Sequence, residues 1–137
     1  MIRRTGAIAW GLVLVIVALQ LGCGGGSAKL TELHRVKSGG LDVVLLSPHD
    51  AIQHGKDRFF IEFRFNGNLV EVGNVRAMAN MPMAGMAMFG NVDVQRTNVP
   101  GRYAASGQFE MAGTWRTTIE WDGAVGKGSV TFSETVQ

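Results

Sequence analysis

The chain has 137 residues, 46% hydrophobic and 18% charged, a composition that fits one folded domain and excludes a disordered chain. Arg3 and Arg4 account for the net charge of +2, because the rest of the chain carries Lys/Arg and Asp/Glu in equal numbers. This neutral body argues against nucleic acid as a partner, since phosphate binding needs clustered cations. The single cysteine excludes an internal disulfide, and alone it cannot form a thiolate zinc site.

Residues 1–22 have the pattern of an export signal. Arg3 and Arg4 precede an apolar stretch at residues 8–21, which is shorter than the ~20 residues of a membrane span. Cys23 follows at once and resembles the lipidated cysteine of the bacterial lipoprotein lipobox, although Gln20 stands where Leu is usual. The resemblance implies a lipid anchor to a membrane of the cell envelope, with the chain facing the periplasm or the cell exterior. The alternatives are a plain signal peptide or an uncleaved anchor.

The rest of the chain divides into a tether and one domain. Residues 23–38 are rich in glycine, serine and mixed charge without an apolar period, which predicts a flexible tether. From residue 39 to 137, short apolar runs alternate with turn signals, which predicts an all-β domain after the signal helix. The seven predicted strands are 41–47, 58–66, 69–78, 88–96, 102–109, 113–121 and 124–132. Seven short strands favour an antiparallel sandwich of two sheets.

The apolar faces of these strands predict the core of the domain. Alternation along the strands turns one set of large side chains inward: Phe59, Ile61, Phe63, Tyr103, Phe109, Trp115 and Ile119. Asn66 and Gly67 predict a hairpin turn after the second strand.

Five methionines lie within eleven residues, at Met78, Met81, Met83, Met86 and Met88. Pro82 and Gly85 predict a loop or irregular edge here, because Pro lacks the ladder donor and Gly weakens a strand. Met81 and Met83 form one i, i+2 pair, Met86 and Met88 form another, and a bend would let the two pairs converge. Thioethers are soft, uncharged ligands suited to Cu(I) or Ag(I) and poorly suited to Zn, Mg or Ca. Met111 is a further candidate ligand near the same end.

A second interpretation of the methionine segment needs no metal. Methionine is flexible and fills irregular gaps, so the segment can equally plug one end of a sandwich or form an apolar docking patch for another protein. The sequence leaves both interpretations open.

Three segments in order, 80–86, 100–103 and 109–116, resemble the YtkA-like domain family over about residues 41–121. The resemblance implies an extracytoplasmic immunoglobulin-like sandwich. Such domains also occur beside adaptor subunits of heavy-metal efflux pumps and resemble part of the FixH proteins of oxidase assembly, both of which are copper settings. The positions that match the family pattern are Met81, Met83 and Met86 in the first segment, Tyr103 in the second, and Met111, Gly113 and Trp115 in the third. Family members often place a His near the methionine segment, whereas this chain has none after His54, which argues against Cu(II).

The sequence favours a binding domain over an enzyme. All three histidines precede the second predicted strand, no serine lies in a nucleophile motif, and the glycine run at 24–26 follows a signal peptide, not a strand. Two functions from different classes therefore remain. One is a lipid-anchored module that holds Cu(I) or Ag(I) for an efflux pump or for oxidase assembly, and the other is a metal-free interaction domain of the envelope.

Overall fold

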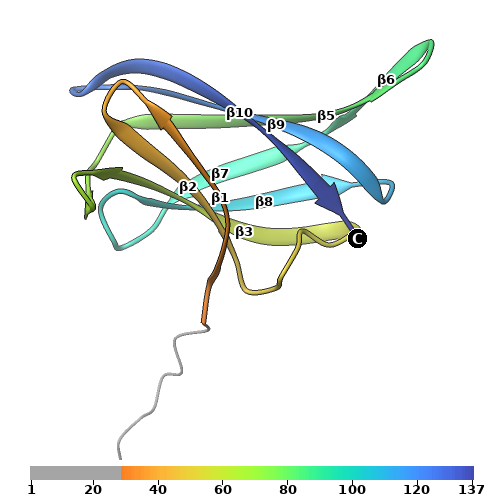
Figure 1. Cartoon of the computed structure of the whole chain (residues 1–137), viewed down its shortest axis with the longest axis horizontal. Coiled ribbons are helices and arrows are strands. Elements are labelled where there is room, and N and C mark those ends of the chain that lie inside the picture. Colours follow the sequence, from red (N-terminus) through yellow and green to blue (C-terminus); the bar gives the residue numbers. More distant parts are fainter. Residues whose placement is uncertain (1–28) are drawn as a thin grey trace, which may run out of the picture.

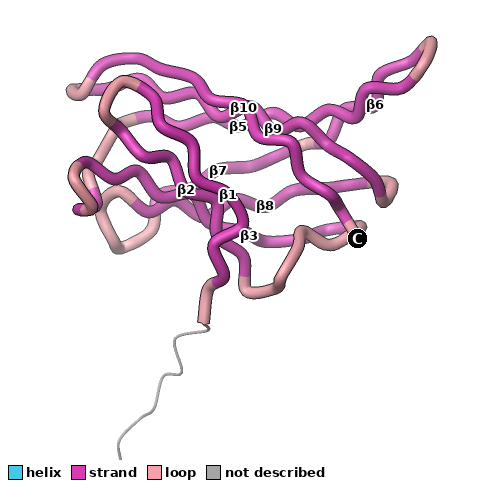
Figure 2. Tube along the Cα trace, viewed as in Figure 1, coloured by secondary structure: helices cyan, strands magenta, loops and turns pink. Residues whose placement is uncertain are grey.

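The computed structural model describes residues 29–137. The expected signal peptide at 1–22, Cys23 and the first part of the expected tether lie outside the described residues. The described part consists of strands joined by loops (Figure 2), and no helix in it is long and apolar enough to cross a membrane. Its ten strands are β1 (Thr31–Ser38), β2 (Leu41–Ser47), β3 (Gly55–Phe65), β4 (Asn68–Leu69), β5 (Asn74–Met83), β6 (Met86–Gly90), β7 (Val92–Arg96), β8 (Arg102–Phe109), β9 (Gly113–Gly123) and β10 (Gly126–Val136).

Two antiparallel sheets pack face to face as a sandwich (Figure 1), which confirms the predicted all-β architecture. We call them sheet A, with strand order β1-β2-β3-β8-β7 and β4 paired to β3, and sheet B, with order β10-β9-β5-β6. Between them lie all seven side chains predicted as core, each at most 2% exposed. The predicted turn at Asn66-Gly67 is also confirmed, because both residues have the positive φ that a tight hairpin turn requires.

The predicted number of strands was wrong, and β1 is one reason. Residues 31–38, expected to be flexible tether, pair with β2 along the edge of sheet A. A bulge between Glu32 and His34 allows both Leu33 and Val36 to pack against the core. This odd spacing breaks the period of two by which a strand is recognised.

The other extra strands arise where the chain changes sheet. The predicted strand 69–78 divides into β4, which pairs with β3 in sheet A, and β5, which pairs with β9 in sheet B. The predicted strand 88–96 divides into β6 in sheet B and β7 in sheet A. At this second crossing a Cβ on Gly90 would lie 2.9 Å from the carbonyl oxygen of Gln108 and 3.2 Å from the Trp115 ring, so the chain passes where only glycine fits.

One side of the sandwich is closed by contacts between β1 and β10. Nε2 of His34 lies 2.5 Å from Oε1 of Glu134, and the His34 ring packs at 5.9 Å from the ring of Phe132. His34 therefore connects the edges of the two sheets. This structural role differs from the tether position that the sequence predicted for it.

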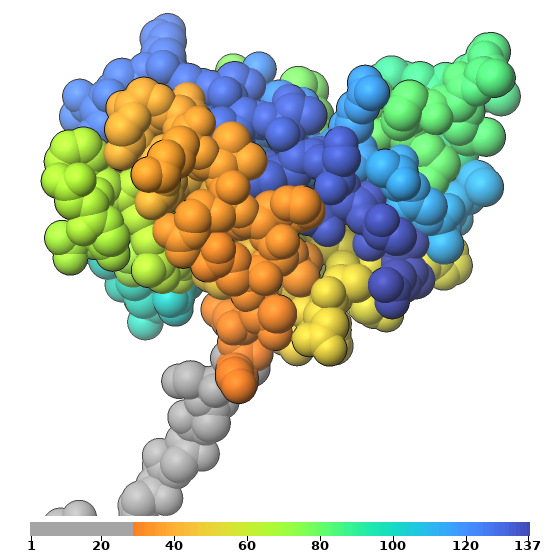
Figure 3. All heavy atoms as spheres, viewed as in Figure 1, coloured from red at the N-terminus to blue at the C-terminus, as the bar shows by residue number. Residues whose placement is uncertain are grey.

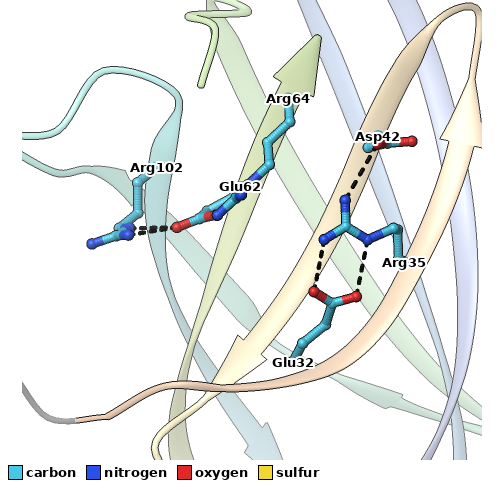
Figure 4. A network of polar contacts seen from close by, with 6 residues as sticks. All are labelled: Glu32, Arg35, Asp42, Glu62, Arg64 and Arg102. Carbon is cyan, nitrogen blue, oxygen red and sulfur yellow. Dashed lines mark hydrogen bonds and ion pairs between the residues drawn. The ribbon is translucent and has the colours of Figure 1, made fainter. Parts of the chain in front are cut away.

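The outer face of sheet A is covered by an ion-pair network (Figure 4). Glu62 is fully buried, and its carboxylate accepts hydrogen bonds of 2.8 Å from Nε of Arg64 and from Nε of Arg102. Beside it, Arg35 bonds Glu32 at 2.8 Å and Asp42 at 3.3 Å. The contacts form two clusters: Arg35 joins β1 to β2 through Glu32 and Asp42, and Glu62 joins β3 to β8 through Arg102.

Candidate functional site

The methionine segment forms a regular hairpin at the edge of sheet B, so of the predicted loop or irregular edge the loop was wrong. β5 and β6 pair from Ala79↔Gly90 to Met83↔Met86 around a turn at residues 84–85. Pro82 is tolerated because the pairing of β5 with β9 ends at Asn80, so Pro82 removes no hydrogen bond from that ladder. A proline at an unpartnered edge is compatible with a strand, and the sequence alone did not show that the edge is free.

This hairpin projects from the sandwich. In Figure 1 the β5–β6 hairpin extends past the body of the molecule as a narrow arm, and in Figure 3 its atoms form a separate lobe in green. Beyond Asn80 the strand β5 has only β6 as a neighbour. Side chains near the tip therefore lack an opposing sheet to pack against.

Four methionines share one face of the hairpin. The register places Met81 opposite Met88 and Met83 opposite Met86. Directly opposed residues of an antiparallel pair point to the same side, with Cβ atoms roughly 4.5–5.5 Å apart, and residues two apart in a strand also share a face. The two methionine pairs that the sequence identified are thus brought together, and we call Met81, Met83, Met86 and Met88 the thioether face.

Burial changes steeply along the thioether face. Met81 is 7% exposed and Met88 is half-buried against the core, whereas Met83 is 45% and Met86 72% exposed. Met81 packs on Gly113 of β9, where a Cβ would lie 2.8 Å from Cε of Met81. The base of the thioether face is therefore part of the sandwich core, and its tip is open to solvent.

Met78 does not join this group. It lies on the opposite face of β5, an odd number of residues from Met81, and its side chain is 58% exposed. Phe89 of β6 lies on the same opposite face, paired to Asn80, and is 78% exposed. The hairpin thus presents thioethers on one face and a separate apolar surface on the other.

Met111 lies in the loop between β8 and β9. Its carbonyl accepts a 2.9 Å hydrogen bond from Nε1 of the buried Trp115, which holds the loop in place, while its side chain is 44% exposed. Gly113, on which Met81 packs, is two residues further along. The structure therefore places Met111 at the same end of the sandwich as the hairpin.

The sequence did not reveal that His54 contacts the β8–β9 loop, which carries Met111. Nε2 of His54 lies 3.2 Å from the carbonyl oxygen of Glu110, the residue before Met111. The two positions are 56 residues apart, and only the pairing of β3 with β8 joins them, so no local pattern could have revealed the contact.

The imidazole and carboxylate side chains of the described part do not gather into a cluster as the thioethers do on the hairpin. Among residues 29–137, no three His, Cys, Asp or Glu side chains gather in a way that could hold a metal ion. A site on the hairpin would consist of sulfur ligands alone, which suits a soft monovalent cation.

Two groups with shifted pKa values, Tyr103 and Glu71, lie at the opposite end of the sandwich. The hydroxyl of Tyr103 donates a 2.7 Å hydrogen bond to Oε1 of Glu71 and lies 2.9 Å from the carbonyl oxygen of Gly73. Burial and this bond to Glu71 raise the pKa of Tyr103 to about 12, and the same bond lowers the pKa of Glu71. These two contacts hold the chain at Glu71 and Gly73, where it crosses from sheet A to sheet B.

The chain matches a protein-family model. The family model of YtkA-like proteins matches residues 35–120, from the middle of β1 to late in β9, and thus includes the whole methionine hairpin. None of the curated proteins compared with the chain matches it. Because the family match covers more than half of the chain, the chain belongs to the YtkA-like family.

Proposed function

We propose that this chain is a lipid-anchored binding domain of the cell envelope that holds Cu(I) or Ag(I) transiently on the thioether face of its β5–β6 hairpin. The register of the hairpin carries the proposal, because it directs four thioethers to one side of a projecting arm. Three of these sulfurs suffice for trigonal coordination of a soft monovalent cation.

The gradient of burial supports transient binding. The sulfur of Met81 is anchored in the core, while Met83 and Met86 are exposed and flexible. An ion bound between fixed and mobile ligands can be approached by another protein from the tip. This arrangement fits delivery to an efflux pump or to an oxidase under assembly, which we propose as the class of partner.

Neutral thioethers do not titrate, so Cu(I) binding to the hairpin should not depend on pH. The test is an anaerobic Cu(I) titration of the full chain in detergent against a competing chelator. The triple variant Met81→Leu, Met83→Leu, Met86→Leu keeps the apolar volume and removes the sulfur lone pairs. We expect saturable binding by the natural chain and its loss in the triple variant.

Met78→Leu is the matched control, because Met78 belongs to the same strand and lies on the other face. It should bind Cu(I) like the natural chain. Equal and weak signals from the natural chain and the triple variant would overturn the metal-binding proposal.

The lipid anchor requires its own test. Cys23 follows directly on the apolar stretch, which supports lipidation at this position. The change Cys23→Ser should move the protein from the membrane fraction to the soluble fraction of the cell, as seen by immunoblotting. A protein that remains at the membrane would point to an uncleaved anchor instead.

A metal-free interaction domain is the second candidate function. It is favoured by Phe89 and Met78, whose exposed apolar side chains lie on the face of the hairpin opposite the thioethers. Under this alternative, the triple Met→Leu variant would retain partner binding, whereas Phe89→Ser would lose it.

A further inference from the structure

A hollow on the outer face of sheet A is bordered by three arginines. It has a volume of about 330 Å³ and lies over β3, β8 and β7, with the β7–β8 turn at one end. Its charged lining residues are Arg58, Arg96 and Arg102, and no carboxylate of the described residues lines it. Positive charge gathered around one hollow favours an anionic ligand.

Ala104 forms the floor of the hollow. The register places Ala104 between Phe60 of β3 and Gln95 of β7. Directly opposed residues point to the same side of a sheet, so two longer side chains stand on either side of one methyl group. The short side chain between longer neighbours explains why the surface is depressed at this point.

Two of the arginines are held at the border of the hollow. Cζ of Arg58 lies 5.7 Å from the centroid of the Phe60 ring, which places this guanidinium over the residue paired with Ala104. Nε and Nη2 of Arg102 lie 2.8 Å and 2.6 Å from Oε1 of Glu62 (Figure 4), which leaves the N–H groups of Nη1 available. Both guanidiniums are thus positioned before any ligand arrives.

The positive charge at the hollow is only partly compensated. Glu62 is a single carboxylate shared by two arginines, Arg64 and Arg102. Within residues 29–137 the guanidinium of Arg58 pairs with no carboxylate, although Asp93 lies beside it in an adjoining depression. The planar N–H groups of arginine match the oxygens of a phosphate group and can bind two of them at once. The hollow therefore suits a phosphate group.

The chain enters the domain close to this hollow. β1 begins at Thr31, which pairs with Ser47, and the preceding residue of β2, Leu46, pairs with Phe60. Two strand spacings amount to roughly 10 Å, which separates the entry point from the border of the hollow. Cys23 comes eight residues before Thr31, and a chain of that length spans at most about 29 Å. A lipid on Cys23 therefore keeps the hollow near the headgroups of the membrane.

We propose that this hollow binds the phosphate group of an anionic phospholipid headgroup, with Arg58 and Arg102 as its ligands. Basic pockets of this kind recognise lipid headgroups through charge and hydrogen bonds. The site gives the domain a second contact with the membrane and so a preferred orientation on it. The choice of a lipid over free phosphate rests on the lipid anchor proposed above, whereas the phosphate site itself does not.

The test is NMR spectroscopy of the full chain in a non-ionic detergent, which follows the Nε–H signals of the arginines. Inorganic phosphate and a short-chain phosphatidylglycerol are added in separate titrations, and sodium chloride at equal ionic strength controls for screening. We expect the signals of Arg58 and Arg102 to shift saturably with both compounds, at lower concentration with phosphatidylglycerol. Arg116, an exposed arginine of β9 in sheet B, is the internal control and should not shift.

Two variants act on the hollow in different ways. Arg58→Gln removes an arginine that pairs with no described carboxylate, so it should preserve the fold and weaken phosphate binding about tenfold, the loss expected for one hydrogen bond to a charged group. Ala104→Leu keeps every charge and fills the floor of the hollow, so it should also prevent binding. Arg116→Gln is the matched control and should bind like the natural chain. Unchanged tryptophan fluorescence verifies the fold of each variant.

The outcomes separate the site from its source of phosphate. Shifts with inorganic phosphate but not with phosphatidylglycerol would keep the phosphate site and overturn the lipid as its ligand. No shift with either compound would overturn the site, and so would equal shifts at Arg116 or with sodium chloride. None of these results bears on Cu(I) binding by the hairpin, which has its own titration.

Discussion

Sheet B contains two hairpins that use apolar residues in opposite ways. In the β9–β10 hairpin, inward-facing side chains such as Trp115, Ile119 and Phe132 are at most 2% exposed, and the outward positions carry polar residues such as Thr118 and Thr131, whose hydroxyls lie 3.0 Å apart. In the β5–β6 hairpin, Met86 and Phe89 remain more than 70% exposed. For Met86 the difference follows from position, because β9 and β10 lie opposite sheet A and the tip of β5–β6 does not, whereas Phe89 lies on the outward face of its hairpin.

The comparison separates two roles of methionine within a single chain. Met81 lies where the hairpin still belongs to the sandwich, and it fills space against Gly113. Met83 and Met86 lie beyond the sandwich, where no core exists for them to fill. Packing therefore accounts for the base of the thioether face, while its tip needs another explanation, for which we propose metal binding.

The largest expected effect is on the free energy of unfolding, when one phenylalanine of each hairpin is replaced by alanine. Phe132→Ala in β10 should lower the free energy of unfolding by about 3–5 kcal/mol, because it leaves a cavity in the core. Phe89→Ala in β6 should change it by no more than about 0.5 kcal/mol, since the ring is already in solvent. Urea unfolding followed by tryptophan fluorescence measures both. Similar losses would mean that the hairpin packs against the body in solution.

A second prediction uses Tyr103 to report on the body independently of the hairpin. Tyr103 is the single tyrosine of the chain, so ultraviolet absorbance of tyrosinate follows this residue alone. Its pKa should be about 12 in the folded protein and about 10 in denaturant. Because the folded pKa is the higher one, the stabilisation is complete below pH 10 and is lost as the pH rises from 10 through 12.

The triple Met→Leu variant should titrate at the same pH as the natural chain, since Tyr103 lies at the other end of the sandwich. A lowered pKa in that variant would show that the hairpin and the body are coupled. Tyr103→Phe should abolish the absorbance change altogether.

A third prediction compares the two faces of the β5–β6 hairpin by oxidation. Hydrogen peroxide should convert Met86 to the sulfoxide fastest and Met81 slowest, in the order of their exposure. With free Ag(I) at ten times its Kd only about one tenth of the chains are unoccupied, so Met83 and Met86 should oxidise about tenfold more slowly. Met78 should not be protected. Peptide mass spectrometry measures each site, and equal protection of Met78 would contradict binding on one face.

The smallest expected effect concerns the turn of the β9–β10 hairpin. Nζ of Lys127 lies 3.1 Å from Oδ2 of Asp122, with side chains 80% and 58% exposed. Lys127→Ala should change the free energy of unfolding by less than about 1 kcal/mol, because an exposed ion pair contributes little. A larger loss in urea unfolding would indicate that the tip of this hairpin has an unrecognised tertiary contact.

Features that depend on near neighbours in the chain could be predicted from the sequence. The Asn66-Gly67 turn follows from the φ values that these two residues accept, and the core follows from alternation in strands such as β3 and β9. The two methionine pairs could also be identified, because residues two apart in extended chain share a side. The family resemblance was confirmed by the match over residues 35–120.

Other features depend on which strands meet, and these only the tertiary structure decided. The crossing at Gly90 divides one apolar run between two sheets, and β1 becomes a strand only because β2 offers it an edge. Pro82 is compatible with a hairpin because β9 does not reach it. His54 and Glu110 meet because β3 pairs with β8. The sequence by itself therefore determined the alternating core positions, the Asn66-Gly67 turn and the chemistry available, while the pairing of distant strands, which no local pattern encodes, decided where strands begin and end and which residues lie together.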